Sequence, residues 1–163
     1  MRGKSAGFYP THIIHDVVRN SKIKNMHFNS NPRILYIENP TNSCDLVGQM
    51  LWVEKYNCDF TIANTPSQAL FLIDNQPFDL YILEYRLPEM TGVELCRQIR
   101  KTDRTTPILF FTVVSRTDDR DVALAAGANE YLLKPYDLPN LVETVKRLIA
   151  QNRGAAVQPT QIM

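Results

Sequence analysis

The sequence contains few of the residues that mark disulfide-bonded, metal-binding or strongly charged proteins. Three of its 163 residues are cysteines, and the formal net charge at pH 7 is +1. Cys44, Cys58 and Cys96 are odd in number and lack metal-ligand spacing, so they predict small core residues in a reducing compartment. The small net charge gives no overall field that would favour a nucleic acid or a membrane surface as partner.

Long apolar segments are absent as well. The N-terminus carries Arg2 and Lys4 but no apolar signal segment, and no run approaches the length that crosses a membrane. We therefore expect a cytoplasmic protein without membrane contact. The composition, 44% apolar and 21% charged, is that of a globular protein, and 163 residues suffice for one domain with short extensions.

Residues 1–31 form a basic extension ahead of the main pattern. They contain five Lys and Arg residues against one acid, Asp16. Within the extension, Thr11 is placed to cap a short helix that has apolar residues on one face. Two interpretations stay open: a contact with a partner or a second copy of the chain, and a leader without a specific role.

From Arg33 onward, short apolar runs alternate with segments of helical periodicity. Five such units in regular order predict an α/β fold, a doubly wound five-stranded parallel sheet with helices on both faces. We expect this domain to occupy residues 32–151 and a flexible tail to follow over 152–163. The expected strands are 34–37, 60–63, 80–83, 108–111 and 131–133.

The stretch 78–92 shows how the units of this pattern end. Its apolar run stops at Glu84, and Thr91 with Glu94 three residues later forms a capping box that marks the next helix. An acid at the C-terminal end of a buried parallel strand points into the crevice where α/β sheets hold their sites. Polar residues also end other strands, so five side chains are expected at one edge of the sheet: Glu38, Asn39, Glu84, Thr112 and Lys134.

With these motifs, the sequence resembles the receiver domains of bacterial response regulators from about Arg33 to Gln151. The resemblance rests on the motif LEYRLPEMTG, on the strand that ends at Thr112 and on the motif AAGANEYLLKP. In that family a strand-end Asp receives a phosphoryl group from a histidine kinase, an acidic pair binds Mg²⁺, and a Lys and a Ser/Thr contact the phosphate. The resemblance also implies a flavodoxin-like sheet with the strand order 2-1-3-4-5 and a place for a cis bond at Lys134–Pro135. By position it implies Glu84 as the phosphoacceptor equivalent, Glu38 and Asn39 as the acid pair, Thr112 and Lys134 as the phosphate contacts, and Tyr131 as the aromatic switch residue.

Three departures from the family pattern argue against that chemistry. Glu84 replaces the acceptor Asp, and a carboxylate misplaced by about 1 Å can cost roughly 10²-fold in rate. The acid pair reads Glu38-Asn39, which predicts weak or absent Mg²⁺ binding at Glu38, Asn39 and Glu84. Family members keep a small residue after the hydroxyl, whereas Val113 is expected to block this pocket. We therefore predict a pseudo-receiver without metal, cofactor or enzymatic activity.

The resemblance also suggests how such a domain could still signal. An ion pair between Glu84 and Lys134 would either mimic phosphate in part or merely satisfy two strand-end charges, and both interpretations stay open. Tyr131 is either a residue that turns inward and outward or an amphipathic edge residue. The family's usual surface for partners and homodimers is expected around Val122, Tyr131 and Val145.

Three functions follow, in order of support. The first is a stand-alone signalling module of a two-component phosphorelay that acts through protein contacts, since about a dozen residues follow the last predicted helix. The second is a working phosphoreceiver in which a histidine kinase phosphorylates Glu84. The third is a flavodoxin-like binder of a small ligand, against which no glycine-rich phosphate loop follows the first strand. The basic extension gives only nonspecific attraction to nucleic acid.

Overall fold

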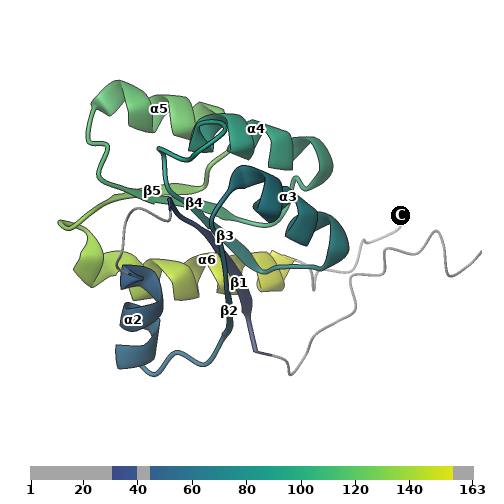
Figure 1. Cartoon of the computed structure of the whole chain (residues 1–163). Coiled ribbons are helices and arrows are strands. Elements are labelled where there is room, and N and C mark those ends of the chain that lie inside the picture. Colours follow the sequence, from purple (N-terminus) through teal and green to yellow (C-terminus); the bar gives the residue numbers. More distant parts are fainter. Residues whose placement is uncertain (1–30, 40–44, 156–163) are drawn as a thin grey trace, which may run out of the picture. The chain divides into compact units, whose positions relative to one another are not determined.

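Five parallel strands form one sheet in the computed structural model, which describes residues 31–39 and 45–155 (Figure 1). The order across the sheet is β2-β1-β3-β4-β5, as predicted. Residues 1–30 of the predicted extension lie outside the described residues. The strands are β1 (Arg33–Ile37), β2 (Asp59–Ala63), β3 (Leu80–Leu83), β4 (Ile108–Thr112) and β5 (Glu130–Leu133). The helices are α2 (Leu46–Val53), α3 (Pro66–Asn75), α4 (Gly92–Thr102), α5 (Thr117–Ala125), the short 3₁₀ helix η1 (Leu138–Asn140) and α6 (Leu141–Ala155).

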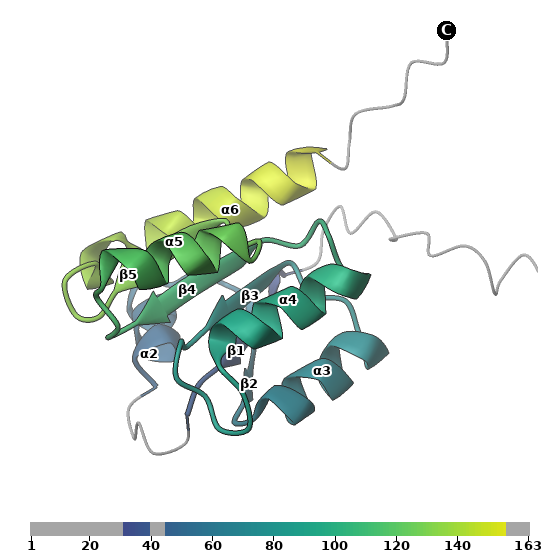
Figure 2. The same cartoon turned by 90° about the horizontal axis from the view of Figure 1, so that it is seen from above.

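Helices cover both faces of the sheet, which agrees with the prediction (Figure 2). Helices α3, α4 and α5 pack on one face, and α2 and α6 pack on the other. Side chains of β1 alternate between the two cores, with Leu35 and Ile37 on the first face and Ile34 and Tyr36 on the second. Because β1, β3 and β4 are apolar on both faces, the polar groups gather where these strands end.

Helix α4 begins at the predicted capping box. The Thr91 hydroxyl accepts a hydrogen bond from the Glu94 backbone N–H at 3.2 Å, and the Glu94 carboxylate accepts one from the Thr91 backbone N–H at 2.8 Å. Two backbone donors that the helix leaves without partners are thereby satisfied. The box fixes the far end of the loop that leads from Glu84 to α4.

Helix α6 extends beyond the predicted end of the domain at residue 151. It continues to Ala155, and Arg153 pairs with Asp79 at 3.0 Å. Asp79 also accepts a hydrogen bond from the Arg33 backbone N–H at 2.8 Å, so this contact ties the helix end to the start of β1. The predicted tail was therefore wrong for residues 152–155, because a pairing across the sheet leaves no local pattern in the sequence. Residues 156–163 lie outside the described part of the chain.

The structure bears on the predicted burial of the cysteines and on the predicted lack of membrane-spanning segments. Cys96 is fully buried and Cys58 is half-buried, while Cys44 lies outside the described residues. The predicted core role is therefore confirmed for Cys96. Among the described residues, no helix combines the length and the apolar character that a membrane crossing requires.

Candidate functional site

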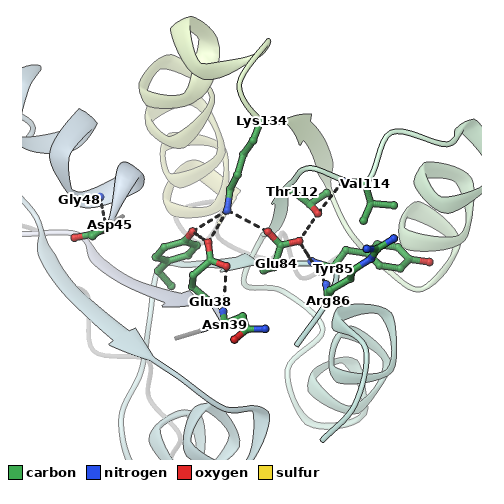
Figure 3. Close-up of polar contacts among 11 residues, drawn as sticks. Glu38, Asn39, Asp45, Gly48, Glu84, Tyr85, Arg86, Thr112, Val114 and Lys134 are labelled. Atoms are coloured by element: carbon green, nitrogen blue, oxygen red, sulfur yellow. Dashed lines mark hydrogen bonds and ion pairs between the residues drawn. The ribbon is translucent and has the colours of Figure 1, made fainter. Parts of the chain in front are cut away.

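The ends of β1, β3, β4 and β5 bring the predicted site residues to one edge of the sheet (Figure 3). Glu38, Glu84 and Lys134 each donate a backbone N–H to a residue of the neighbouring strand, at 3.2, 2.9 and 2.8 Å. The sheet's hydrogen bonding thus continues one residue past each strand, and the three charged side chains start from a rigid edge. The Lys134–Pro135 peptide bond is cis, as the resemblance implied.

The Lys134 ammonium lies between two buried carboxylates. Its Nζ is 2.5 Å from Glu38 Oε2 and 3.1 Å from Glu84 Oε2. Glu38 is 6% exposed and Glu84 is 1% exposed. The Glu84–Lys134 pair that the sequence predicted is present, and the shorter pair with Glu38 was not predicted. The two carboxylates share this cation, and buried carboxylates are tolerable only with further hydrogen bonds.

The second oxygen of Glu84 receives those hydrogen bonds. The Thr112 hydroxyl donates a very short hydrogen bond to Glu84 Oε1. The backbone N–H groups of Tyr85 and Arg86 donate to the same oxygen at 2.7 and 3.4 Å. The hydroxyl and the ammonium therefore bind opposite oxygens of a single carboxylate.

Tyr36 is a member of the site that the sequence analysis missed. Its hydroxyl donates a very short hydrogen bond to Glu38 Oε2 and accepts one from Lys134 Nζ at 3.2 Å. Burial, followed by the hydrogen bond and charge of Glu38 and the charge of Glu84, raises the pKa of Tyr36 far above its ordinary value, so the hydroxyl stays protonated. The sequence carried one signal for this role: Tyr36 lies two residues before Glu38, and alternate residues of a strand share a face.

Tyr131 is turned into the domain and is 3% exposed. Its hydroxyl donates to the Val114 carbonyl at 2.7 Å, and its ring stacks on Phe110 with centroids 5.8 Å apart. Val114 N–H in turn donates to the Thr112 hydroxyl at 3.2 Å, which links Tyr131 to the site. Val113, between Thr112 and Val114, is 61% exposed and borders a cavity. These observations do not test whether it blocks the phosphate pocket, which stays a prediction.

The predicted partner surface needs a correction. Val145 is fully buried and Tyr131 nearly so, because both contribute to the cores beneath α5 and α6. Of the three residues named for this surface, Val122 at 41% exposed is accessible. Val145 lies on the apolar stripe of α6 together with Val142, Leu148 and Ile149, and a residue buried in such a stripe cannot also face a partner.

Gly92 lets the first turn of α4 approach the site closely. A Cβ added at this position would overlap the Glu84 carbonyl oxygen and lie 3.0 Å from the Phe110 ring. The Gly92 N–H donates to the Tyr85 carbonyl at 2.8 Å, which holds the helix start against the backbone that carries Glu84. Position 92 therefore requires glycine, because the site leaves no room for a Cβ atom.

We expect the Gly92→Ala variant to lose about 1–3 kcal/mol of unfolding free energy, because the new methyl group forces backbone apart in a packed region. Urea denaturation followed by circular dichroism measures this loss. Gly154→Ala is the matched control, since an added Cβ there meets nothing within 4 Å. Equal stability of the two variants would contradict the steric account of Gly92.

Residues 34–146 match the family described as the response regulator receiver domain. Response regulator ArlR of Staphylococcus epidermidis is 36% identical over 116 residues, which cover 71% of this chain and 52% of that protein. Response regulator RppA of Synechocystis is 33% identical over 129 residues, which cover 78% of this chain and 53% of that protein. The chain therefore spans about half the length of these curated relatives.

Two solved receiver domains illustrate the structural similarity. A CheY-like receiver domain protein from Methanospirillum hungatei is similar with a TM-score of 0.68 and 28% identity, over 77% of this chain and 99% of that one. The receiver domain of sensor histidine kinase PA1611 from Pseudomonas aeruginosa, which has a magnesium ion coordinated in its active-site cleft, is similar with a TM-score of 0.64 and 30% identity, over 74% and 99% of the two chains. The family match over residues 34–146 includes Glu38, Glu84 and Lys134, which meet at the edge of the sheet.

Proposed function

Because this chain belongs to the response regulator receiver domain family of two-component systems, we propose that it is a signalling module that works without being phosphorylated. It acts through contacts with another protein and not as an enzyme. Family membership favours this proposal over the flavodoxin-like binder of a small ligand. The arrangement around Lys134 is the observation that carries it.

The buried charges at the sheet edge already satisfy one another. Lys134 contacts both Glu38 and Glu84, and Thr112 donates to the remaining oxygen of Glu84. In the family, the equivalents of Thr112 and Lys134 bind the phosphoryl group, so Glu84 offers them a carboxylate in its place. A carboxylate brings one charge and two oxygens, whereas a phosphoryl group brings about −1.5 to −2 charges and three oxygens. We propose that Glu84 holds the module part of the way toward its switched state.

The same contacts make the residues a poor fit for magnesium. Mg²⁺ demands near-ideal octahedral oxygen geometry and is usually held by carboxylates. Here both carboxylates face an ammonium, and Asn39 offers a neutral amide where the family has an acid. A dication entering the site would have to displace Lys134 from Glu38 at 2.5 Å. We therefore assign no step to a metal in this chain.

A working phosphoreceiver is the alternative, and one structural observation favours it. Glu84, Thr112 and Lys134 still converge, and the PA1611 receiver domain, 30% identical to this chain, coordinates magnesium in its cleft. On this alternative a histidine kinase would phosphorylate Glu84. The two proposals differ in one measurable quantity, the mass of the protein after exposure to a phosphoryl donor.

We expect incubation with acetyl phosphate and Mg²⁺ to leave the intact mass unchanged, because the longer Glu84 carboxylate is held by Thr112 and Lys134 in a position that is not that of the family's Asp. Electrospray mass spectrometry at several times checks this. A receiver domain with the family's Asp, treated in parallel, shows that the donor is competent. A stoichiometric gain of one phosphoryl group on Glu84 would establish the alternative.

A further inference from the structure

A cavity of about 390 Å³ lies beside the site, on the side of Glu84 away from Glu38. Residues 85–86 after β3, residues 113–116 after β4, and Asp119 of α5 line it, and we call it the Arg86–Arg116 cavity. In Figure 3, Tyr85, Arg86 and Val114 stand on one side of Glu84, and Glu38 and Asn39 stand on the other. Since one water takes up about 30 Å³ in the liquid, the cavity has room for a tetrahedral anion with several waters.

The charges that line the cavity favour an anion. Arg86 and Arg116 both contribute to its walls, and neither guanidinium has an ion-pair or hydrogen-bond partner within the described part of the chain. Asp119 is the one carboxylate among the lining residues, and it accepts a hydrogen bond from the Tyr85 hydroxyl at 3.0 Å. The exposed Ser115 adds a hydroxyl to the same wall. Two forked guanidinium groups and a hydroxyl are donors suited to phosphate oxygens.

The cavity wall is connected to the switch residues by hydrogen bonds. Val114 donates its N–H to the Thr112 hydroxyl at 3.2 Å and accepts from the Tyr131 hydroxyl at 2.7 Å. Arg86 N–H reaches Glu84 Oε1 at 3.4 Å. A ligand that orders the two loops therefore acts on the groups that contact Glu84 and Tyr131.

We propose that the Arg86–Arg116 cavity binds a phosphate group non-covalently, as inorganic phosphate or as the phosphate of a small monoester, and that this binding regulates the module. The inference rests on the proposed function, because a domain that is not phosphorylated needs another input. The anion occupies the cavity and forms no bond with Glu84. The side chains of Arg86 and Arg116 hold it, and they are separate from the contacts that Lys134 makes with the two glutamates.

An NMR titration of the ¹⁵N-labelled full chain tests this binding. Sodium phosphate is added at constant ionic strength against sodium chloride, so that screening of surface charge is matched. We expect saturable shifts of the amides of residues 85–86, 113–116 and 131, with a Kd on the order of 1 mM, which corresponds to about −4 kcal/mol. A parallel titration with O-phosphoserine identifies the source, since a tighter Kd for the monoester assigns a phosphorylated small molecule and an equal Kd assigns free phosphate.

Paired charge variants separate the site from general attraction. The double variant Arg86→Gln and Arg116→Gln should bind phosphate at least about tenfold more weakly, a loss of about 1.4 kcal/mol. The double variant Lys101→Gln and Arg104→Gln removes the same charge from exposed positions outside the cavity and should bind as the wild type does. The spectrum of each variant reports its fold directly.

Two results would overturn the inference: no saturation with either anion, or equal weakening in the two double variants. Neither result touches the proposed function, because inorganic phosphate is not a phosphoryl donor. Conversely, covalent phosphorylation by acetyl phosphate would remove the proposed function and would be seen in the mass spectrum, whatever the titration gives. The phosphate titration and the mass measurement can therefore each contradict one proposal without affecting the other.

Discussion

Replacing Lys134 with methionine is expected to lower the free energy of unfolding by about 3–5 kcal/mol, since removal of one partner leaves buried charge without compensation. Its ammonium pairs with both Glu38 and Glu84, and its side chain is 12% exposed. Methionine keeps most of the volume, so the loss reports charge and not a cavity. Denaturation in urea, monitored by circular dichroism, gives the value.

The control for the Lys134→Met variant removes the charge of an exposed lysine. Lys101→Met is the matched control, because Lys101 is exposed at the end of α4. An exposed ion pair contributes up to about 1 kcal/mol. If Lys134→Met loses less unfolding free energy than this at pH 7, the contacts of Lys134 with Glu38 and Glu84 do not behave as a buried ion-pair network.

The sheet edge at which Glu38, Glu84 and Lys134 meet was predictable from the sequence, because each part of it has a local cause. Apolar runs of four or five residues indicate strands that are buried on both faces, and the residue after such a strand must lie at the sheet's carboxyl edge. That reasoning placed Glu84, Thr112 and Lys134 together, and the structure has them in contact. The capping box of Thr91 was confirmed in the same way, and the strand order agrees with what the resemblance implied.

What escaped prediction depends on side chains from distant parts of the chain. Tyr36 has the appearance of one more core aromatic in an apolar run, and its hydroxyl matters only because Lys134 arrives 98 residues later. The Glu38–Lys134 pair was likewise not visible, since the sequence does not say which of two acids an ammonium approaches more closely. The Arg86–Arg116 cavity arises from two loops and an exposed helix start, for which periodicity carries no information.

Aspartate at positions 38, 39 and 84 is expected to give the domain a Mg²⁺ affinity that, on our proposal, is weak or absent in the wild type. The Glu38→Asp and Glu84→Asp changes shorten two side chains by one methylene and draw each carboxylate back from Lys134 by about 1.5 Å. The Asn39→Asp change adds a third carboxylate, and Mg²⁺ strongly prefers charged oxygen ligands to neutral ones. Isothermal titration calorimetry with MgCl₂ compares the triple variant with the wild type, and acetyl phosphate with intact-mass measurement then tests for phosphorylation.

Two simpler variants show which change matters. Asn39→Asp alone adds charge but leaves both glutamates on Lys134, so it should bind Mg²⁺ poorly if the ammonium is the obstacle. Glu84→Asp alone withdraws only the 3.1 Å contact and leaves the 2.5 Å contact with Glu38 in place, so it too should stay unphosphorylated. If the triple variant binds no Mg²⁺ while its fold is intact, carboxylate length and charge are not what separates this chain from its relatives. The obstacle would then lie in Tyr36, whose hydroxyl still faces position 38, or in the loop that begins at Val113.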